Sequence, residues 1–192
     1  MKRMIGAAMA GAVLVLAVPA TAQLEGSPSQ RFVEAVRKSD GDTVSQLLES
    51  NPGTLLNARD YDGMTALLVA IDRRDDDWTA FLLGKGADPN LASRDGKTPL
   101  IAAARIGYDD AVGWLLGKGA RVDSTNRMGE TALIVAVQQR QSNAVKILLS
   151  AGADPDKTDG AAGLSARDYA KRDNRARDIL RMIESSKPKS GN

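Results

Sequence analysis

A short phrase recurs along this chain at a constant interval, and this regularity limits the possible folds more than any other feature. The phrase has six residues: any residue, Gly, any residue, Thr, then Ala or Pro, and finally Leu. It occupies residues 62–67, 95–100 and 128–133. A second phrase, Leu-Leu-x-x-Gly-Ala, keeps the same interval at 82–87, 115–120 and 148–153. Two separate phrases with one period indicate a unit that is repeated and stacked.

Each unit carries the signals of two short helices followed by a loop. Thr65, Thr98 and Thr131 precede apolar runs, where a threonine hydroxyl accepts a backbone N–H at the start of a helix. In a fourth, degenerate copy, Ser165 lies one position beyond the same interval after Thr131. Helices of about 8 to 10 residues do not persist alone in water, so stability must come from stacking the units. Positive φ angles are expected at the turn glycines Gly63, Gly96, Gly129 and Gly163 and at the helix-ending glycines Gly86, Gly119 and Gly152.

These phrases resemble the ankyrin repeat, through Asp-Gly-x-Thr-Pro-Leu-x-x-Ala at 95–103 and Gly-Ala-Asp-Pro-Asn at 86–90. The resemblance implies an all-α repeat solenoid, in which helix-turn-helix units are joined by β-turn or hairpin loops. About five units are expected within residues 31–186, the first and last being degenerate caps, followed by a flexible tail at 187–192. Their expected ranges are 31–56, 57–89, 90–122, 123–156 and 157–186.

The chain departs from the family pattern at two kinds of position. The family's histidine, which links neighbouring loops through hydrogen bonds, is replaced by Leu68, Ile101, Ile134 and Asp168. The resemblance therefore predicts that this network is missing, and that apolar packing offsets it. Arg74 and Arg140 stand where the family has Gly at the end of the first helix. A left-handed backbone there would cost each arginine about 1 kcal/mol.

Residues 1–22 predict a secretory signal peptide, because Lys2 and Arg3 precede an apolar stretch and an Ala-x-Ala step ends at Ala22. An uncleaved anchor is the alternative, since residues 4–24 carry no charge and would just span a bilayer. Cleavage after Ala22 leaves a linker at 23–30 and removes two of 26 positive charges, so 24 remain against 24 acidic residues. We expect a periplasmic protein with no electrostatic attraction to nucleic acid or to a membrane after leader removal.

The sequence contains neither Cys nor His, which excludes disulfides, thiolate nucleophiles, Ser-His-Asp triads and imidazole metal sites. Residues 96–98 (Gly-Lys-Thr) lack the earlier glycine of a phosphate-binding loop, and residues 154–160 do not keep the calcium-loop frame. The acidic run 75–77 suits the start of a second helix. Trp78 and Trp114 are interpreted as packing residues. No cofactor, metal or catalytic residue is predicted.

Recognition of another protein is the leading interpretation, through a groove formed by the turns and the first helices. The resemblance implies that the outward residues there contact the partner. The candidates are Tyr61, Asp62, Met64, Asp72, Arg73, Arg94, Asp95, Lys97, Arg105, Ile106, Arg127, Met128, Glu130, Gln138 and Gln139. Among them, the strongest hot-spot candidates are Tyr61, Arg94, Ile106, Arg127 and Met128.

Three functions are compatible with these observations. The leading hypothesis is a non-catalytic scaffold or adaptor in the bacterial cell envelope, expected to be a monomer. The second is an inhibitor or immunity-type protein that blocks an envelope enzyme or toxin. The third is an enzyme that uses only Asp, Glu, Ser, Lys and Tyr, such as a glycosidase with two carboxylates, although stacked helices offer it no deep cavity.

Overall fold

The computed structural model describes residues 26–51 and 53–186, and this part of the chain forms ten α-helices and no β-sheet. The helices are α1 (Pro28–Arg37), α2 (Gly41–Ser50), α3 (Ala66–Asp72), α4 (Asp76–Gly84), α5 (Pro99–Ile106), α6 (Asp109–Gly117), α7 (Ala132–Gln138), α8 (Ser142–Ser150), α9 (Ala166–Arg172) and α10 (Arg177–Ser185). They make five helix pairs, so the predicted all-α repeat solenoid of about five units is confirmed.

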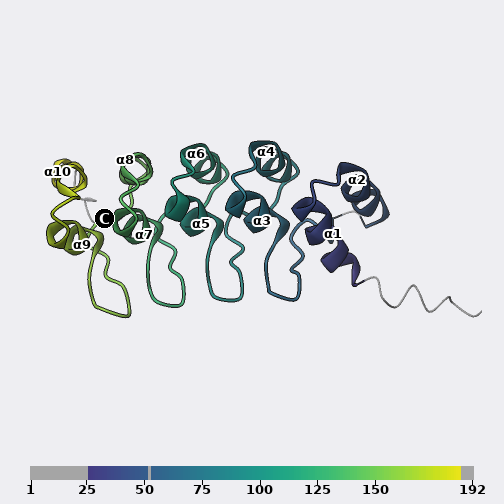
Figure 1. The fold of residues 1–192 in the computed structure, drawn as a ribbon, viewed down its shortest axis with the longest axis horizontal. Coiled ribbons are helices and arrows are strands. Elements are labelled where there is room, and N and C mark those ends of the chain that lie inside the picture. The colour runs from purple at the N-terminus through teal and green to yellow at the C-terminus, as the bar shows by residue number, and fades with distance from the viewer. Residues whose placement is uncertain (1–25, 52, 187–192) are drawn as a thin grey trace, which may run out of the picture.

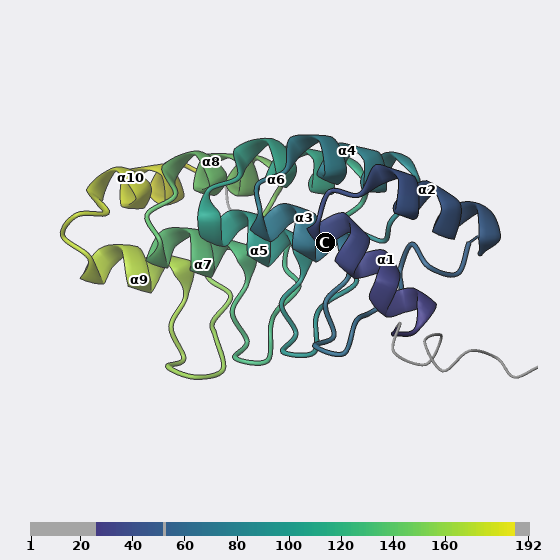
Figure 2. The same ribbon diagram turned by 45° about the vertical axis from the view of Figure 1, so that its right-hand side comes forward.

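The helices lie in two rows (Figures 1 and 2). The first helices α1, α3, α5, α7 and α9 form one row, and the second helices α2, α4, α6, α8 and α10 form the other. Each first helix packs on the second helix of its own pair, and α1, α3, α5 and α7 also pack on the first helix of the next pair. The loops that lead from each second helix to the next first helix all project to the same side, away from the second helices.

Helix boundaries follow the predicted capping residues. The hydroxyl oxygens of Thr65, Thr98 and Thr131 each accept the N–H of the residue three positions later at 3.2 Å. Ser165 does the same and also forms a capping box with Asp168. Every turn glycine and helix-ending glycine predicted to have a positive φ has one. The local signals in the sequence therefore set where each of these helices begins and ends.

The core runs along the whole stack, because each inner helix is covered on several sides. Residues 66–71 of α3 and 132–137 of α7 are all buried. Leu68, Ile101 and Ile134, at the positions of the family's histidine, are each 0% exposed. At these three positions apolar packing replaces the hydrogen-bonding side chain, as predicted.

The N-terminal boundary differs from the prediction. Helix α1 begins at Pro28, with the Ser27 hydroxyl accepting the Gln30 N–H at 3.3 Å, so residues 28–30 belong to the first unit rather than to a linker. The predicted signal peptide at 1–22 and the tail at 187–192 lie outside the described residues. None of the helices within 26–51 and 53–186 is both long and apolar enough to cross a membrane.

Candidate functional site

The four projecting loops share one hairpin design, and we call their ends the fingers (residues 59–65, 92–98, 125–131 and 158–165). In each finger a backbone N–H donates across the turn: Asp60 to Met64 O at 2.9 Å, and Asn126 to Glu130 O at 3.0 Å, for example. The Asp60 and Asn126 side chains each accept two further N–H groups of their own turn at 2.8–3.0 Å. A polar residue thus fixes each tip from within, at Asp60, Ser93, Asn126 and Asp159.

Neighbouring fingers lie in direct backbone contact. The Gly160 N–H donates to Met128 O at 2.8 Å, and the Arg94 guanidinium donates to Tyr61 O at 2.7 Å. Gly129 has φ +77°, and a Cβ there would lie 2.4 Å from the Gly160 nitrogen. The glycine is therefore required both by its own turn and by the close approach of the next finger. The fingers form one connected edge rather than four independent loops.

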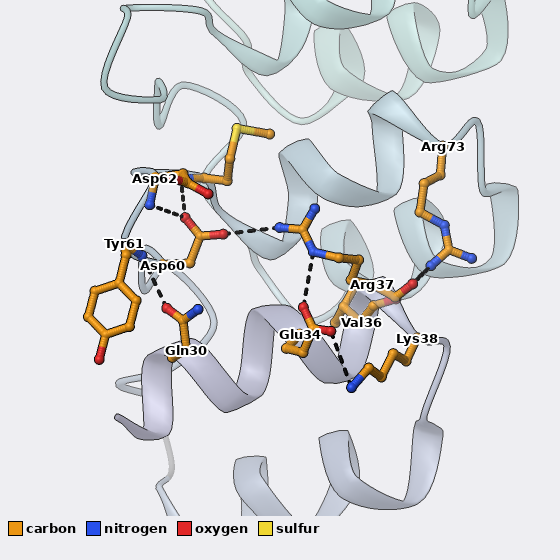
Figure 3. Close-up of polar contacts among 10 residues, drawn as sticks. Gln30, Glu34, Val36, Arg37, Lys38, Asp60, Tyr61, Asp62 and Arg73 are labelled. Carbon is orange, nitrogen blue, oxygen red and sulfur yellow. Dashed lines mark hydrogen bonds and ion pairs between the residues drawn. The ribbon is translucent and has the colours of Figure 1, made fainter. Parts of the chain in front are cut away.

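The first finger is also tied to α1 (Figure 3). The Arg37 guanidinium forms an ion pair with the buried Asp60 carboxylate at 3.1 Å, and its Nε lies 3.2 Å from Glu34 Oε2. The Gln30 side-chain oxygen accepts the Tyr61 N–H at 3.1 Å. These contacts hold the degenerate first unit in register with the regular units.

Arginines at the ends of the first helices join successive units. Arg74 has φ +53° and Arg140 has φ +54°, so the backbone is left-handed at both, and each arginine bears the cost considered from sequence. Arg74 donates to Ile106 O and Gly107 O, both at 2.9 Å, at the end of α5, and its guanidinium lies 5.6 Å from the centre of the Tyr108 ring. Arg140 forms a 3.1 Å ion pair with Asp173. These contacts with the next unit offset the backbone strain at Arg74 and Arg140.

Most of the predicted partner-binding residues take part in contacts within the fold. Arg73 donates to the carbonyls of Val36 and Arg37 and to the Ser39 hydroxyl, and Lys97 forms a 2.9 Å ion pair with Asp72. Other predicted residues with such contacts, by backbone or side chain, are Asp62, Met64, Arg94, Asp95, Glu130 and Gln138. Ile106 is half-buried and packs against the core, so the expectation that it is fully exposed is wrong, whereas its contact with a partner stays a prediction.

A smaller set of the predicted residues presents side chains to solvent. Tyr61 is 67% exposed and Met128 is 53% exposed, each at the tip of a finger. The side chains of Arg105, Arg127 and Gln139 are exposed as well, and make no hydrogen bond or ion pair within residues 26–51 and 53–186. Along the row of first helices, a shallow hollow of about 320 Å³ is lined by Gln138 and by residues of α7 and α9. The arrangement suits contact with a macromolecular surface.

Several ionisable groups near the fingers and the second helices form hydrogen bonds within the fold that shift their pKa values. The Tyr169 hydroxyl donates to the buried Asp159 carboxylate at 2.6 Å, and this bond lowers the pKa of Asp159 and raises that of Tyr169. Burial and a hydrogen bond to Asp76 raise the pKa of Tyr108 to about 12. In the described part of the chain, no three acidic side chains are grouped as a metal site would require.

Sequence reasoning missed two features. The tip-fixing residues at 60, 93, 126 and 159 recur with the same constant interval as the phrases, so the period itself could have revealed them. Trp114, interpreted as a packing residue, is 37% exposed on α6, and its ring makes an edge contact with Tyr108 at 6.2 Å between ring centres. Trp114 and Leu115 are adjacent large apolar residues. Nothing in the local sequence indicates that the first is partly exposed and the second buried.

Comparison with known proteins agrees with this geometry. A bovine (Bos taurus) mitochondrial disaggregase is 44% identical over 68 residues, which make up 34% of this chain. The chain spans only about a tenth of the length of that curated relative. The family model described as "Ankyrin repeats (3 copies)" matches twice, at residues 32–126 and 75–159, which together include all of the regular units. With five stacked helix pairs, hairpin fingers and this match over most of its length, the chain belongs to the ankyrin repeat family.

Proposed function

We propose that this chain is a non-catalytic protein-binding module of the bacterial cell envelope. Its contact surface is the finger edge together with the exposed ends of the first helices α3, α5 and α7. The partner is another protein, and the binding needs no cofactor.

One observation carries the proposal: the finger tips are fixed by hydrogen bonds, yet they present large exposed side chains that make no hydrogen bond within the described residues. Tyr61 and Met128 stand on hairpins fixed by internal hydrogen bonds and by neighbouring fingers. Tyrosine, methionine and arginine are enriched at protein interfaces, and a rigid mount lowers the entropy lost on binding. Arg105, near the end of α5, and Arg127, in the third finger, add exposed positive charge.

The location in the envelope is supported by the sequence alone. Residues 1–22 have the basic start, apolar middle and small-residue end of an export signal, and the absence of cysteine removes any dependence on disulfide formation there. Intact-mass measurement of the protein from a periplasmic fraction tests the location. A mature chain that starts at Gln23 is expected, whereas an unprocessed chain in the cytoplasm would contradict it.

Site-specific photo-crosslinking in living cells tests the binding surface. A photo-reactive phenylalanine analogue replaces Tyr61 or Met128, and a matched control replaces the exposed Glu184 on α10. We expect a discrete crosslinked protein from positions 61 and 128 and none from position 184. An adaptor leaves the activity of the captured partner unchanged, whereas an inhibitor or immunity protein lowers it.

Substitution then measures the contribution of the finger tips. The variant Tyr61→Ala with Arg127→Ala and Met128→Ala is expected to bind the captured partner at least about tenfold more weakly. The pair Arg177→Ala and Glu184→Ala on α10 is the control, and it should bind as the unchanged chain does. Equal binding by both variants would move the contact away from the fingers.

A further inference from the structure

The outer row of second helices carries a patch that the finger-edge proposal does not use. Helices α4 and α6 lie side by side in this row (Figures 1 and 2) and pack against each other. Phe81 on α4 and Trp114 on α6 are 36% and 37% exposed. Between the helices runs an apolar hollow of about 430 Å³, lined by Ala80, Leu83, Gly84, Gly113, Trp114, Gly117 and Lys118.

Small residues flank each aromatic ring in the same register. Helix α4 has Ala80-Phe81-x-x-Gly84, and α6 has Gly113-Trp114-x-x-Gly117 at the equivalent positions of the next repeat. The three glycines have helical backbone, and an added Cβ would meet nothing within 4 Å at any of them. Since glycine inside a helix is less stable than alanine, the isolated fold gains nothing from these glycines. Small residues on an exposed helix face do allow another helix to approach closely.

Hollows also lie between α6 and α8 and between α8 and α10. The second helices that follow in the row, however, carry neither an exposed aromatic ring nor a glycine. Helix α8 exposes Asn143 and Lys146, which line the hollow beside α6. The exposed side chains of α10 are mostly charged, at Arg177, Asp178, Arg181 and Glu184. The combination of exposed aromatic rings with helical glycines is therefore a property of α4 and α6 rather than of every repeat. A partner that fits it must match these two helices and their charges.

The charges at the two ends of the patch have opposite sign. Asp77 and Asp110 are exposed at the starts of α4 and α6, and Lys85 and Lys118 are exposed at their ends. This order also suits the two helix dipoles. The same order makes the charges of the patch complementary to those of a second copy. When a copy is rotated by 180° about an axis through the centre of the patch, its acidic end faces the basic end of the original.

We propose that the α4–α6 patch is a two-fold contact between two copies of this chain. The helices of the two copies run antiparallel. The small residues of each patch let the facing helix approach closely, and Trp114 covers apolar surface of the other copy. The contact joins molecules back to back and leaves all the fingers outward, so one dimer presents two finger edges. The proposal replaces the monomer expected from sequence, and it does not depend on the proposed function.

Sedimentation velocity on the chain as cells process it tests self-association, at concentrations from about 1 to about 300 µM. We expect a reversible monomer–dimer equilibrium in this range. The variant Gly84→Ala with Gly113→Ala and Gly117→Ala is expected to dissociate at least about tenfold more readily, while its urea unfolding midpoint stays equal or rises. A misfolded variant would show the opposite shift in midpoint.

Two results would overturn the proposal. One is a chain that remains monomeric up to about 300 µM, which would leave the patch to a different partner. The other is a triple-alanine variant that dimerises as strongly as the unchanged chain, since such a dimer would use another surface. Lys146→Glu on α8 is the control, and it should leave the dimer unchanged.

Charge reversal tests the antiparallel orientation. Lys85→Glu with Lys118→Glu makes both ends of the patch acidic, and Asp77→Lys with Asp110→Lys makes both ends basic. Each double variant alone should be monomeric, and the two mixed together should form a one-to-one dimer. Failure of the mixture to associate, with the unchanged chain dimeric, would contradict the orientation.

Discussion

The finger edge and the α4–α6 patch are both exposed, but their exposed residues are used in opposite ways. On the finger edge, many charged and polar side chains that face solvent also bond to a neighbouring unit, as Arg94 and Lys97 do. On the α4–α6 patch, a Cβ added at Gly84, Gly113 or Gly117 would meet nothing within 4 Å. Exposed side chains of the finger edge help to join neighbouring units. The three glycines of the α4–α6 patch have open space beside them and no such role.

This difference teaches that exposure alone does not identify a recognition residue. A side chain that joins two units changes stability when it is replaced, and binding then changes only as a consequence. A side chain or glycine outside those contacts can change binding without harm to the fold. The two surfaces can therefore be separated by measuring stability and association on the same variants.

The largest effect is expected from Gly129→Ala in the third finger. The substitution places a Cβ 2.4 Å from the Gly160 nitrogen and requires a left-handed backbone for alanine. We expect the free energy of unfolding to fall by about 2 to 4 kcal/mol, measured by urea denaturation. A loss below about 0.5 kcal/mol would show that the fingers separate easily and that the edge is not rigid.

A second comparison concerns Arg74, where strain and bonding oppose each other. Arg74→Ala removes two hydrogen bonds to carbonyls at the end of α5 and keeps the positive φ, so we expect a loss of about 2 kcal/mol. Arg74→Gly removes the same bonds but relieves the backbone, so it should be about 1 kcal/mol more stable than the alanine variant. Equal unfolding free energies for the two variants would contradict the strain at this position.

A third prediction uses pH to isolate the Asp159–Tyr169 bond. Because the folded pKa of Asp159 lies below its ordinary value of 3.8, the stability from its ionised form is present above pH 3.8 and is lost as the pH falls through the folded pKa. Tyr169→Phe should lower stability by about 1 kcal/mol at neutral pH and by less near pH 2.5. Tyr61→Phe, which removes an exposed hydroxyl, serves as the control, and an equal loss for Tyr169→Phe at both pH values would refute the bond to the carboxylate.

The smallest effect, and one of opposite sign, is expected from Gly117→Ala on α6. Alanine replaces a helical glycine in open space, so the free energy of unfolding should rise by about 0.5 to 1 kcal/mol. The measurement is made near 1 µM, where self-association contributes little. A fall in stability would mean that the glycine is needed by the fold, and it would remove one support for the dimer.

The fold was predictable from sequence because its signals are local and repeated. Thr65 and Gly86 mark the ends of helices through groups a few residues away, and the constant interval multiplies each signal along the chain. The site was less predictable. Arg94 and Ile106 both look outward in a repeat alignment, but one bonds to the previous finger and the other packs against the core.

The repeated phrases by themselves determined that the chain stacks helix pairs and where each pair begins, and the composition determined that no cysteine or histidine chemistry takes part. Only the tertiary structure decided which exposed side chains the fold uses and that Trp114 reaches the surface beside a row of glycines. The physical reason is the range of the interactions. Caps and turns act within a few residues, whereas contacts between units join residues about 33 apart, whose partners the sequence does not name.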